Sequence, residues 1–126
     1  MNKRDEADQK DIFAEIVKIR GFKELPNFYE RMRKYPRLTA QFWESLRAIT
    51  APGALDEKTK ELIAISVCVV LGARFCVDSH IAMAKKIGMT DAELEELLMV
   101  VNVYTQTAMI CSAFNPPYDP SQYDGK

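Results

Sequence analysis

The chain has 126 residues, of which 48% are hydrophobic and 28% are charged, proportions that are ordinary for a soluble globular protein. Its formal net charge of −1 argues against a basic surface, so we expect no nucleic acid and no membrane as partners. The charged N-terminal stretch MNKRDEADQKD has no apolar core after it, which predicts a cytoplasmic protein without a signal peptide. The near-continuous apolar run at 62–71 is too short to cross a bilayer. The length predicts a single domain, residues 1–126.

Three helices are predicted before residue 51. Apolar residues at helical spacing predict the first helix over about 7–20, ended by Gly21. Pro26 begins a short second helix, which is expected to end near residue 34. Pro36 begins the third, with Trp43 in the core or at an interface and a core stripe made of Leu38, Phe42, Leu46 and Ile49. The turn TAPGA at 50–54 is the clearest break in the chain.

The apolar run at 62–71 belongs to the most distinctive segment. Its isoleucines, valines and cysteine also suit a buried strand. Length decides for a helix over 57–71, because the pattern covers about fifteen residues and begins at Asp56, a good N-cap. A helix that is apolar on all sides must be central in the fold or sealed by another subunit.

Two further helices and a tail complete the prediction. Gly72 separates the apolar helix from one over 73–87, which ends at Gly88 and has one face formed by Cys76, His80, Met83, Ala84 and Ile87. Thr90 and Glu93 form a capping box for a last helix over 91–113, with an inward face of Leu94, Leu97, Leu98, Val101, Tyr104 and Ala108. The irregular tail, 115–126, either lies on a neighbouring surface through Tyr118 and Tyr123 or is disordered. The fold class is therefore all-α, with about six helices.

Three residues within the segment 61–80 form a candidate catalytic site. Cys76 lies in the first turn of a helix, where free backbone N–H groups and the helix dipole stabilise a thiolate. His80 follows four residues later on the same face and can take the proton of the thiol. Glu61 can orient His80 if the two helices pack antiparallel, as the short connection at Gly72 suggests. Such a site fits thiolate attack on a peroxide or disulfide, and without the thiol it fits proton transfer near an acidic carbon.

A structural interpretation stands beside the catalytic one. A Cys and a His four residues apart occur often by chance, and free cysteine is among the most buried residue types. We expect Cys68 and Cys111 to be core residues, and all three cysteines to be reduced. A metal held by Glu61, Cys76 and His80 is possible by ligand type, but no other residue supports it. We expect no metal and no cofactor.

Read together, the segments LDEKTKEL at 55–62, ARFCVDSH at 73–80 and AKKIGMTDAEL at 84–94 resemble the carboxymuconolactone decarboxylase family, over roughly 42–113. That family includes enzymes of the alkylhydroperoxidase D type. Its peroxidase branch carries a glutamate, eleven residues, and then Cys-x-x-Cys-x-x-x-His. Glu61, Cys76 and His80 match the glutamate, second cysteine and histidine of this proton relay. Proteins similar to this are all-helical and assemble as homotrimers or homohexamers.

One residue departs from that pattern. Ala73 replaces the first cysteine, so the internal dithiol of the peroxidase branch cannot form unless Cys68 or Cys111 acts as the resolving thiol. The leading hypothesis is therefore a thiol-dependent peroxidase and antioxidant reductase with a single active-site cysteine, Cys76, and an external thiol reductant. The alternatives are a decarboxylase or isomerase of small lactones or keto acids, with His80 and Glu61 as acid and base, and a non-catalytic member of the family.

Overall fold

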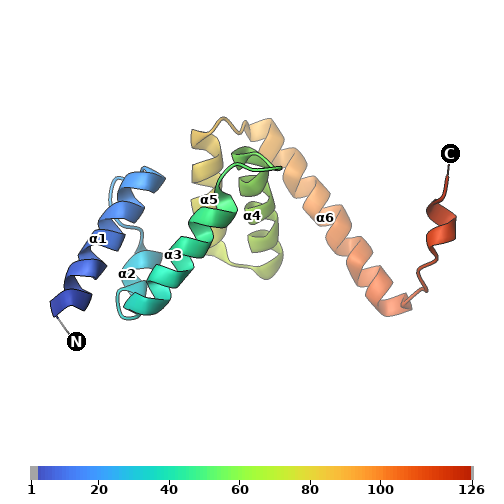
Figure 1. Cartoon of the computed structure of the whole chain (residues 1–126). Helices are drawn as coiled ribbons and strands as arrows, with labels where there is room; N and C mark the ends of the chain where they lie inside the picture. The colour runs from blue at the N-terminus through green and yellow to red at the C-terminus, as the bar shows by residue number, and fades with distance from the viewer. Residues whose placement is uncertain (1–2, 126) are drawn as a thin grey trace. The chain divides into compact units, whose positions relative to one another are not determined.

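The computed structural model describes residues 3–125, with side chains from residue 12 onward (Figure 1). That range contains six α-helices, a short 3₁₀ helix and no strand, which confirms the predicted all-α class. The helices are α1 (Lys3–Arg20), α2 (Asn27–Met32), α3 (Pro36–Thr50), α4 (Glu57–Leu71), α5 (Arg74–Lys86) and α6 (Asp91–Phe114), and the 3₁₀ helix is η1 (Pro120–Tyr123). The chain divides into two compact units, 1–51 and 52–126, at the turn that the sequence marked as a break.

The N-terminal unit packs α1, α2 and α3 around a small aromatic core. Its buried residues are Phe13, Ile16, Tyr29 and Trp43. The rings of Tyr29 and Trp43 meet edge to face, with centroids 6.4 Å apart, so the predicted core role of Trp43 is confirmed. Helix α1 begins four residues before the predicted start and ends at Arg20 as predicted, with Gly21 at a positive φ of 65°.

The predicted core stripe of α3 is only partly right, since Leu46 packs against the aromatic core. Leu38 and Ile49 are 54% and 70% exposed, whereas Thr39 and Trp43 are the buried residues of this helix. Thr39 can be buried because its hydroxyl donates to the carbonyl oxygens of Met32 and Tyr35 at 2.9 and 2.8 Å. The core face of α3 is therefore turned by one residue relative to the predicted stripe. Apolar side chains of the predicted stripe are left on the outer side of the helix.

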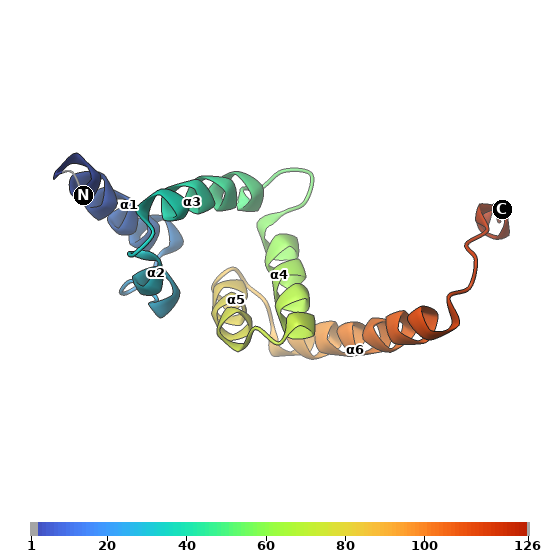
Figure 2. The same ribbon diagram turned by 90° about the horizontal axis from the view of Figure 1, so that it is seen from below.

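Helices α4 and α5 form a tight hairpin in the C-terminal unit, and they lie side by side in both ribbon views (Figures 1 and 2). Asp56 caps α4 by accepting a hydrogen bond from the Thr59 N–H at 2.7 Å, as the sequence predicted. Gly72 ends α4 in the left-handed conformation with φ 68°, which a glycine adopts without steric cost. Ile65, Ala84 and Met89 form the buried cluster beneath this hairpin.

The start of α6 is confirmed, because the Thr90 hydroxyl and the Glu93 carboxylate make the full capping box. Its predicted inward face is only partly right. Leu94 and Leu97 pack against the core cluster, but Leu98 is 36% and Tyr104 67% exposed, and no residue of α6 is buried. By length and composition alone, α6 could also cross a membrane, a test that core helices of soluble proteins pass as well. The tail after Asn115 includes η1, where the rings of Tyr118 and Tyr123 stack.

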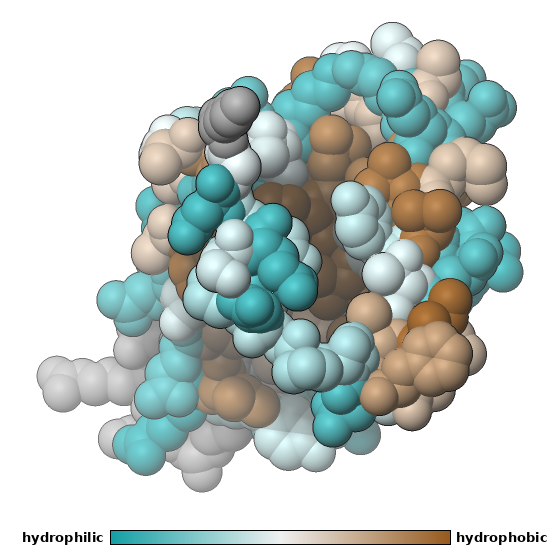
Figure 3. Space-filling view, turned by 90° about the vertical axis from the view of Figure 1, so that its right-hand side faces the viewer, coloured by the Kyte–Doolittle hydropathy of each residue, from teal (hydrophilic) through white to brown (hydrophobic). Residues whose placement is uncertain are grey.

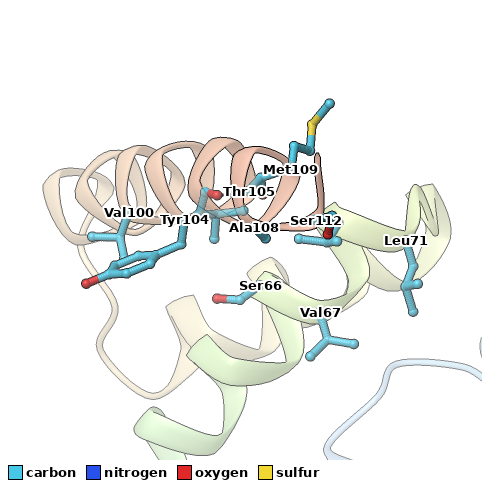
Figure 4. A pocket seen from close by; sticks show the side chains of 11 residues that line it. Ser66, Val67, Leu71, Val100, Tyr104, Thr105, Ala108, Met109 and Ser112 are labelled. Atoms are coloured by element: carbon cyan, nitrogen blue, oxygen red, sulfur yellow. Dashed lines mark hydrogen bonds between the residues drawn. The ribbon is translucent and has the colours of Figure 1, made fainter. Parts of the chain in front are cut away.

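Large apolar side chains on the outer faces of α4 and α6 are uncovered. Ile63, Val67, Val70 and Leu71 of α4 are between 48% and 75% exposed. With α6, Val67, Val70 and Leu71 line an open groove of about 880 Å³, in which the two helices face one another across mostly apolar side chains (Figure 4). In the space-filling view, apolar residues gather around a hollow on this side of the molecule (Figure 3). The prediction that α4 must be central or sealed by a partner is met only on its inner face.

Candidate active site

The central contact of the site joins α4 to α5. Nδ1 of His80 lies 2.7 Å from Oε2 of Glu61, across nineteen positions of sequence. The Glu61 side chain is 6% exposed and that of His80 24% exposed, so the bond is largely shielded from water. A buried carboxylate is unfavourable without a partner, and the imidazole supplies one. The antiparallel packing that the sequence suggested thus brings these two predicted residues together.

The Glu61 contact also determines which nitrogen of His80 can act as a base. An ionised carboxylate only accepts hydrogen bonds, so Nδ1 of His80 must carry the proton that Glu61 receives. The lone pair of the neutral ring then resides on Nε2, which becomes the basic nitrogen. If Nε2 takes up a proton, the resulting imidazolium is stabilised by the Glu61 carboxylate.

Cys76 occupies the position in α5 that the sequence predicted for it. Ala73 is the N-cap of the helix, which makes Cys76 the third helical residue, and its side chain is half-buried. Backbone N–H groups of the first helical turn lack partners within the helix and favour a negative charge there. His80 lies one turn further along the same helix. Cys76 is thus placed as a partly accessible thiol at a helix N-terminus.

The sequence interpretation named Cys68 as one possible resolving thiol but did not predict that it lies near Cys76. It was expected to be core filler, yet it is half-buried and its thiol interacts with that of Cys76. Burial raises the pKa of the Cys68 thiol, and the neighbouring Cys76 sulfur raises this pKa further by its charge and by a hydrogen bond.

A signal for this pairing was present in the sequence. Cys68 precedes Gly72 by four residues and Cys76 follows it by four, so a hairpin that turns at Gly72 brings the two into register. Cys111 behaves differently: it was also expected in the core, but it is exposed on α6, and that prediction is wrong.

The candidate metal ligands were Glu61, Cys76 and His80. Among residues 12–125, whose side chains the structure describes, no three His, Cys, Asp or Glu side chains are grouped as metal ligands. Of these three residues, Glu61 and His80 are joined by a hydrogen bond, and Cys76 lies one helical turn before His80. The apolar groove between α4 and α6 is a separate feature, since none of these three residues lines it.

The fold and the site together define a class of protein: an all-α chain whose helical hairpin presents a helix N-terminal thiol and a His–Glu pair. The sequence model described as the carboxymuconolactone decarboxylase family matches residues 34–116. This chain belongs to the carboxymuconolactone decarboxylase family.

Two known proteins illustrate the relationship. The structure is similar to the crystal structure of the alkylhydroperoxidase AhpD core from Rhodospirillum rubrum ATCC 11170, with a TM-score of 0.86 and 26% sequence identity over 99% of this chain and 95% of that chain. A protein described as "Uncharacterized protein 4 in cox locus", from Paracoccus denitrificans, is 35% identical over 54 residues. That match covers 43% of this chain and 49% of the relative, or about half of the relative's length.

Proposed function

We propose that this protein is a cytoplasmic thiol-dependent peroxidase of the alkylhydroperoxidase type, with Cys76 as the thiol that attacks the peroxide. The observation that carries the proposal is the 2.7 Å bond between His80 and Glu61, on the same hairpin that presents Cys76 at a helix N-terminus. In this proposal His80 is the base and Glu61 the residue that orients it. A non-catalytic role accounts less well for a shielded His–Glu pair one helical turn from a half-buried thiol.

The proposed reaction is balanced as follows. Nε2 of His80 accepts the proton of the Cys76 thiol, and the thiolate attacks one oxygen of the peroxide. The oxygen–oxygen bond breaks, Cys76 becomes a sulfenic acid, and the leaving alkoxide or hydroxide takes the proton from His80. Two electrons from an external thiol reductant return the sulfenic acid to the thiol and release water.

Mass spectrometry of peroxide-treated protein tests this proposal. We expect Cys76 to gain one oxygen, or the adduct of a sulfenic-acid reagent such as dimedone, well before Cys111 does. Cys111 is the internal control, because it is the exposed cysteine. If Cys76 stays unmodified while Cys111 reacts, the peroxidase proposal is wrong.

A second candidate function rests on the same pair. His80 and Glu61 form a complete acid–base unit without any sulfur, which suits a decarboxylase or isomerase of small lactones or keto acids. This candidate predicts that turnover of such a substrate survives Cys76→Ser and is abolished by His80→Ala. The peroxidase proposal predicts that peroxide turnover is lost in both variants. A protein active in neither assay would support the non-catalytic alternative.

We also propose that the protein functions as a homo-oligomer, a homotrimer or homohexamer. The support is the uncovered apolar surface of α4 and α6, which includes the groove of about 880 Å³. Contiguous apolar surface of this kind on a soluble protein marks an interaction site. A second copy of the chain would cover the exposed face of α4 and complete the burial that its all-round apolar sequence predicts.

A further inference from the structure

The two half-buried cysteines lie on facing helices and contact one another. Cys68 is on α4 and Cys76 on α5, each four residues from Gly72, and the two thiols are near enough for Cys76 to influence the Cys68 thiol. The two helices belong to one tightly packed hairpin, so the contact does not depend on how the two units of the chain are arranged. A second thiol therefore lies within reach of the proposed reactive sulfur.

The backbone of the turn explains this approach. The Ala73 N–H donates to the carbonyl oxygen of Cys68 at 2.9 Å, and Gly72 supplies the positive φ that makes this bond possible. The backbone of Ala73, which has no thiol, is thus hydrogen-bonded directly to the backbone of Cys68, which has one. The contact is a built feature of the turn, because Cys68 and Cys76 each lie one helical turn from Gly72.

We propose that Cys68 is the resolving cysteine of this site, and that it forms an intramolecular disulfide with Cys76 across the α4–α5 hairpin during turnover. The proposal rests on the peroxidase function proposed above and replaces its single-cysteine cycle with a two-cysteine one. The missing sulfur at Ala73 is then supplied from the preceding helix.

The resolving step is balanced without any further oxidant. The Cys68 sulfur attacks the sulfur of the Cys76 sulfenic acid, a sulfur–sulfur bond forms, and the sulfur–oxygen bond breaks. The hydroxyl leaves with the Cys68 proton as water. An external dithiol, the reductant class this cycle needs, then exchanges with the disulfide, becomes oxidised to its own disulfide, and restores both cysteines as thiols.

The charge on Cys76 determines which of the two thiols reacts first. While Cys76 is a thiolate, its charge disfavours a second thiolate at Cys68, which stays protonated and does not compete for the peroxide. Oxidation to the neutral sulfenic acid removes that charge. Cys68 can then ionise beside the sulfur that it attacks.

Tryptic peptide mapping of the full-length protein tests the proposal directly. Trypsin places the three cysteines on separate peptides, 61–74 with Cys68, 75–85 with Cys76 and 87–126 with Cys111. Wild-type protein, Cys68→Ser and the matched control Cys111→Ser are each treated with one equivalent of hydrogen peroxide in the presence of dimedone. Parallel samples receive diamide, which oxidises neighbouring thiols without any peroxidase chemistry.

We expect wild type and Cys111→Ser to yield the linked peptides 61–74 and 75–85, with little dimedone adduct. Cys68→Ser is expected to accumulate the adduct on Cys76 at least tenfold over wild type. A wild-type protein that instead accumulates the adduct, or joins Cys76 to Cys111 or to a second chain, overturns the role of Cys68. If diamide forms the Cys68–Cys76 bond but peroxide leaves Cys76 unchanged in every protein, the peroxidase function fails while the dithiol remains. If neither oxidant forms the bond, the dithiol is excluded.

Discussion

His80 and Glu61 are joined by a 2.7 Å hydrogen bond that links α5 to α4 at the shielded side of the hairpin. In the proposed function the two residues have different tasks: Glu61 orients the ring through Nδ1, and Nε2 is the base. Variants of the two residues should therefore differ in their effects.

We expect His80→Ala to lower kcat/KM for a hydroperoxide by about 10²–10⁴-fold, the usual contribution of a positioned acid–base group. Glu61→Gln keeps an oxygen that can accept from Nδ1 but removes the negative charge, so it should lower the rate by less. Stopped-flow rates of Cys76 oxidation provide the measurement. Asp78→Asn on the exposed side of α5 is the matched control, with its side chain 65% exposed. Equal rates in His80→Ala and in the control would contradict the role of His80.

The same hydrogen bond should contribute to stability. His80→Ala leaves a carboxylate that is 6% exposed without its imidazole partner, which we expect to cost about 1–3 kcal/mol. Urea unfolding followed by circular dichroism measures this difference. The Asp78→Asn control should change the unfolding free energy by at most about 0.5 kcal/mol, because exposed ion pairs contribute little.

The capping box of α6 offers a test of the fold alone. Thr90→Ala removes the hydroxyl that accepts from the Glu93 N–H at 3.1 Å, and we expect a loss of about 1 kcal/mol. Thr107→Ala, at an exposed position in the middle of the same helix, is the control. Thermal and urea unfolding should show the loss only in the first variant, and an equal loss in both would mean that the cap is not the cause.

Lowering the pH should weaken the contacts that the Glu93 carboxylate makes at the start of α6. The Lys58 ammonium group, which donates to Glu93 at 2.6 Å, and the Thr90 N–H, which donates at 2.8 Å, hold the pKa of this carboxyl below its ordinary value of 4.5. Stability from a depressed carboxyl pKa is present above the unfolded pKa and is lost as pH falls through the folded one. Urea midpoints measured between about pH 6 and pH 3 should therefore fall less steeply for Glu93→Gln than for wild type. Glu96→Gln, an exposed residue of the same helix, should retain the wild-type slope.

The oligomer proposal predicts a response to charge in the α4–α6 groove. Val67 is 51% exposed and lines the groove, so Val67→Asp should weaken association by about tenfold or more through an unpaired buried charge. Light scattering over a dilution series measures the change. Arg74→Glu, at a side chain that is 90% exposed, should leave the mass unchanged. A wild-type protein that is monomeric at every concentration would contradict the proposal.

Helix boundaries were the most predictable part of this structure, for a local reason. Asp56, Gly72 and Thr90 act on the backbone within one turn of themselves, so their effect is readable from sequence alone. The bounds of α4 and the start of α6 agree with prediction, and α5 differs by one residue at each end.

Faces and pairings were less predictable because they depend on packing between helices. Helix α3 carries apolar residues on two sides, and only its neighbours decide that Trp43, not Leu38, faces the core. Helix α6 is apolar around its circumference, so periodicity gives no inward side. The Glu61–His80 pair could be predicted because a short turn joins its helices. The same reasoning could have predicted that Cys68 lies near Cys76, but a small buried thiol has a commoner explanation as core filler.

The α4–α5 hairpin also bears on which parts of the protein form first during folding. Glu61, Cys68, Cys76 and His80 all lie within residues 61–80, and contacts of such short sequence separation form early and quickly during folding. The groups of the site can therefore assemble as soon as α4 and α5 meet, while the outer face of α4 is still uncovered. If the protein assembles as proposed above, we expect a newly synthesised chain to have its thiols in place, and open to oxidation, before it associates with a second copy.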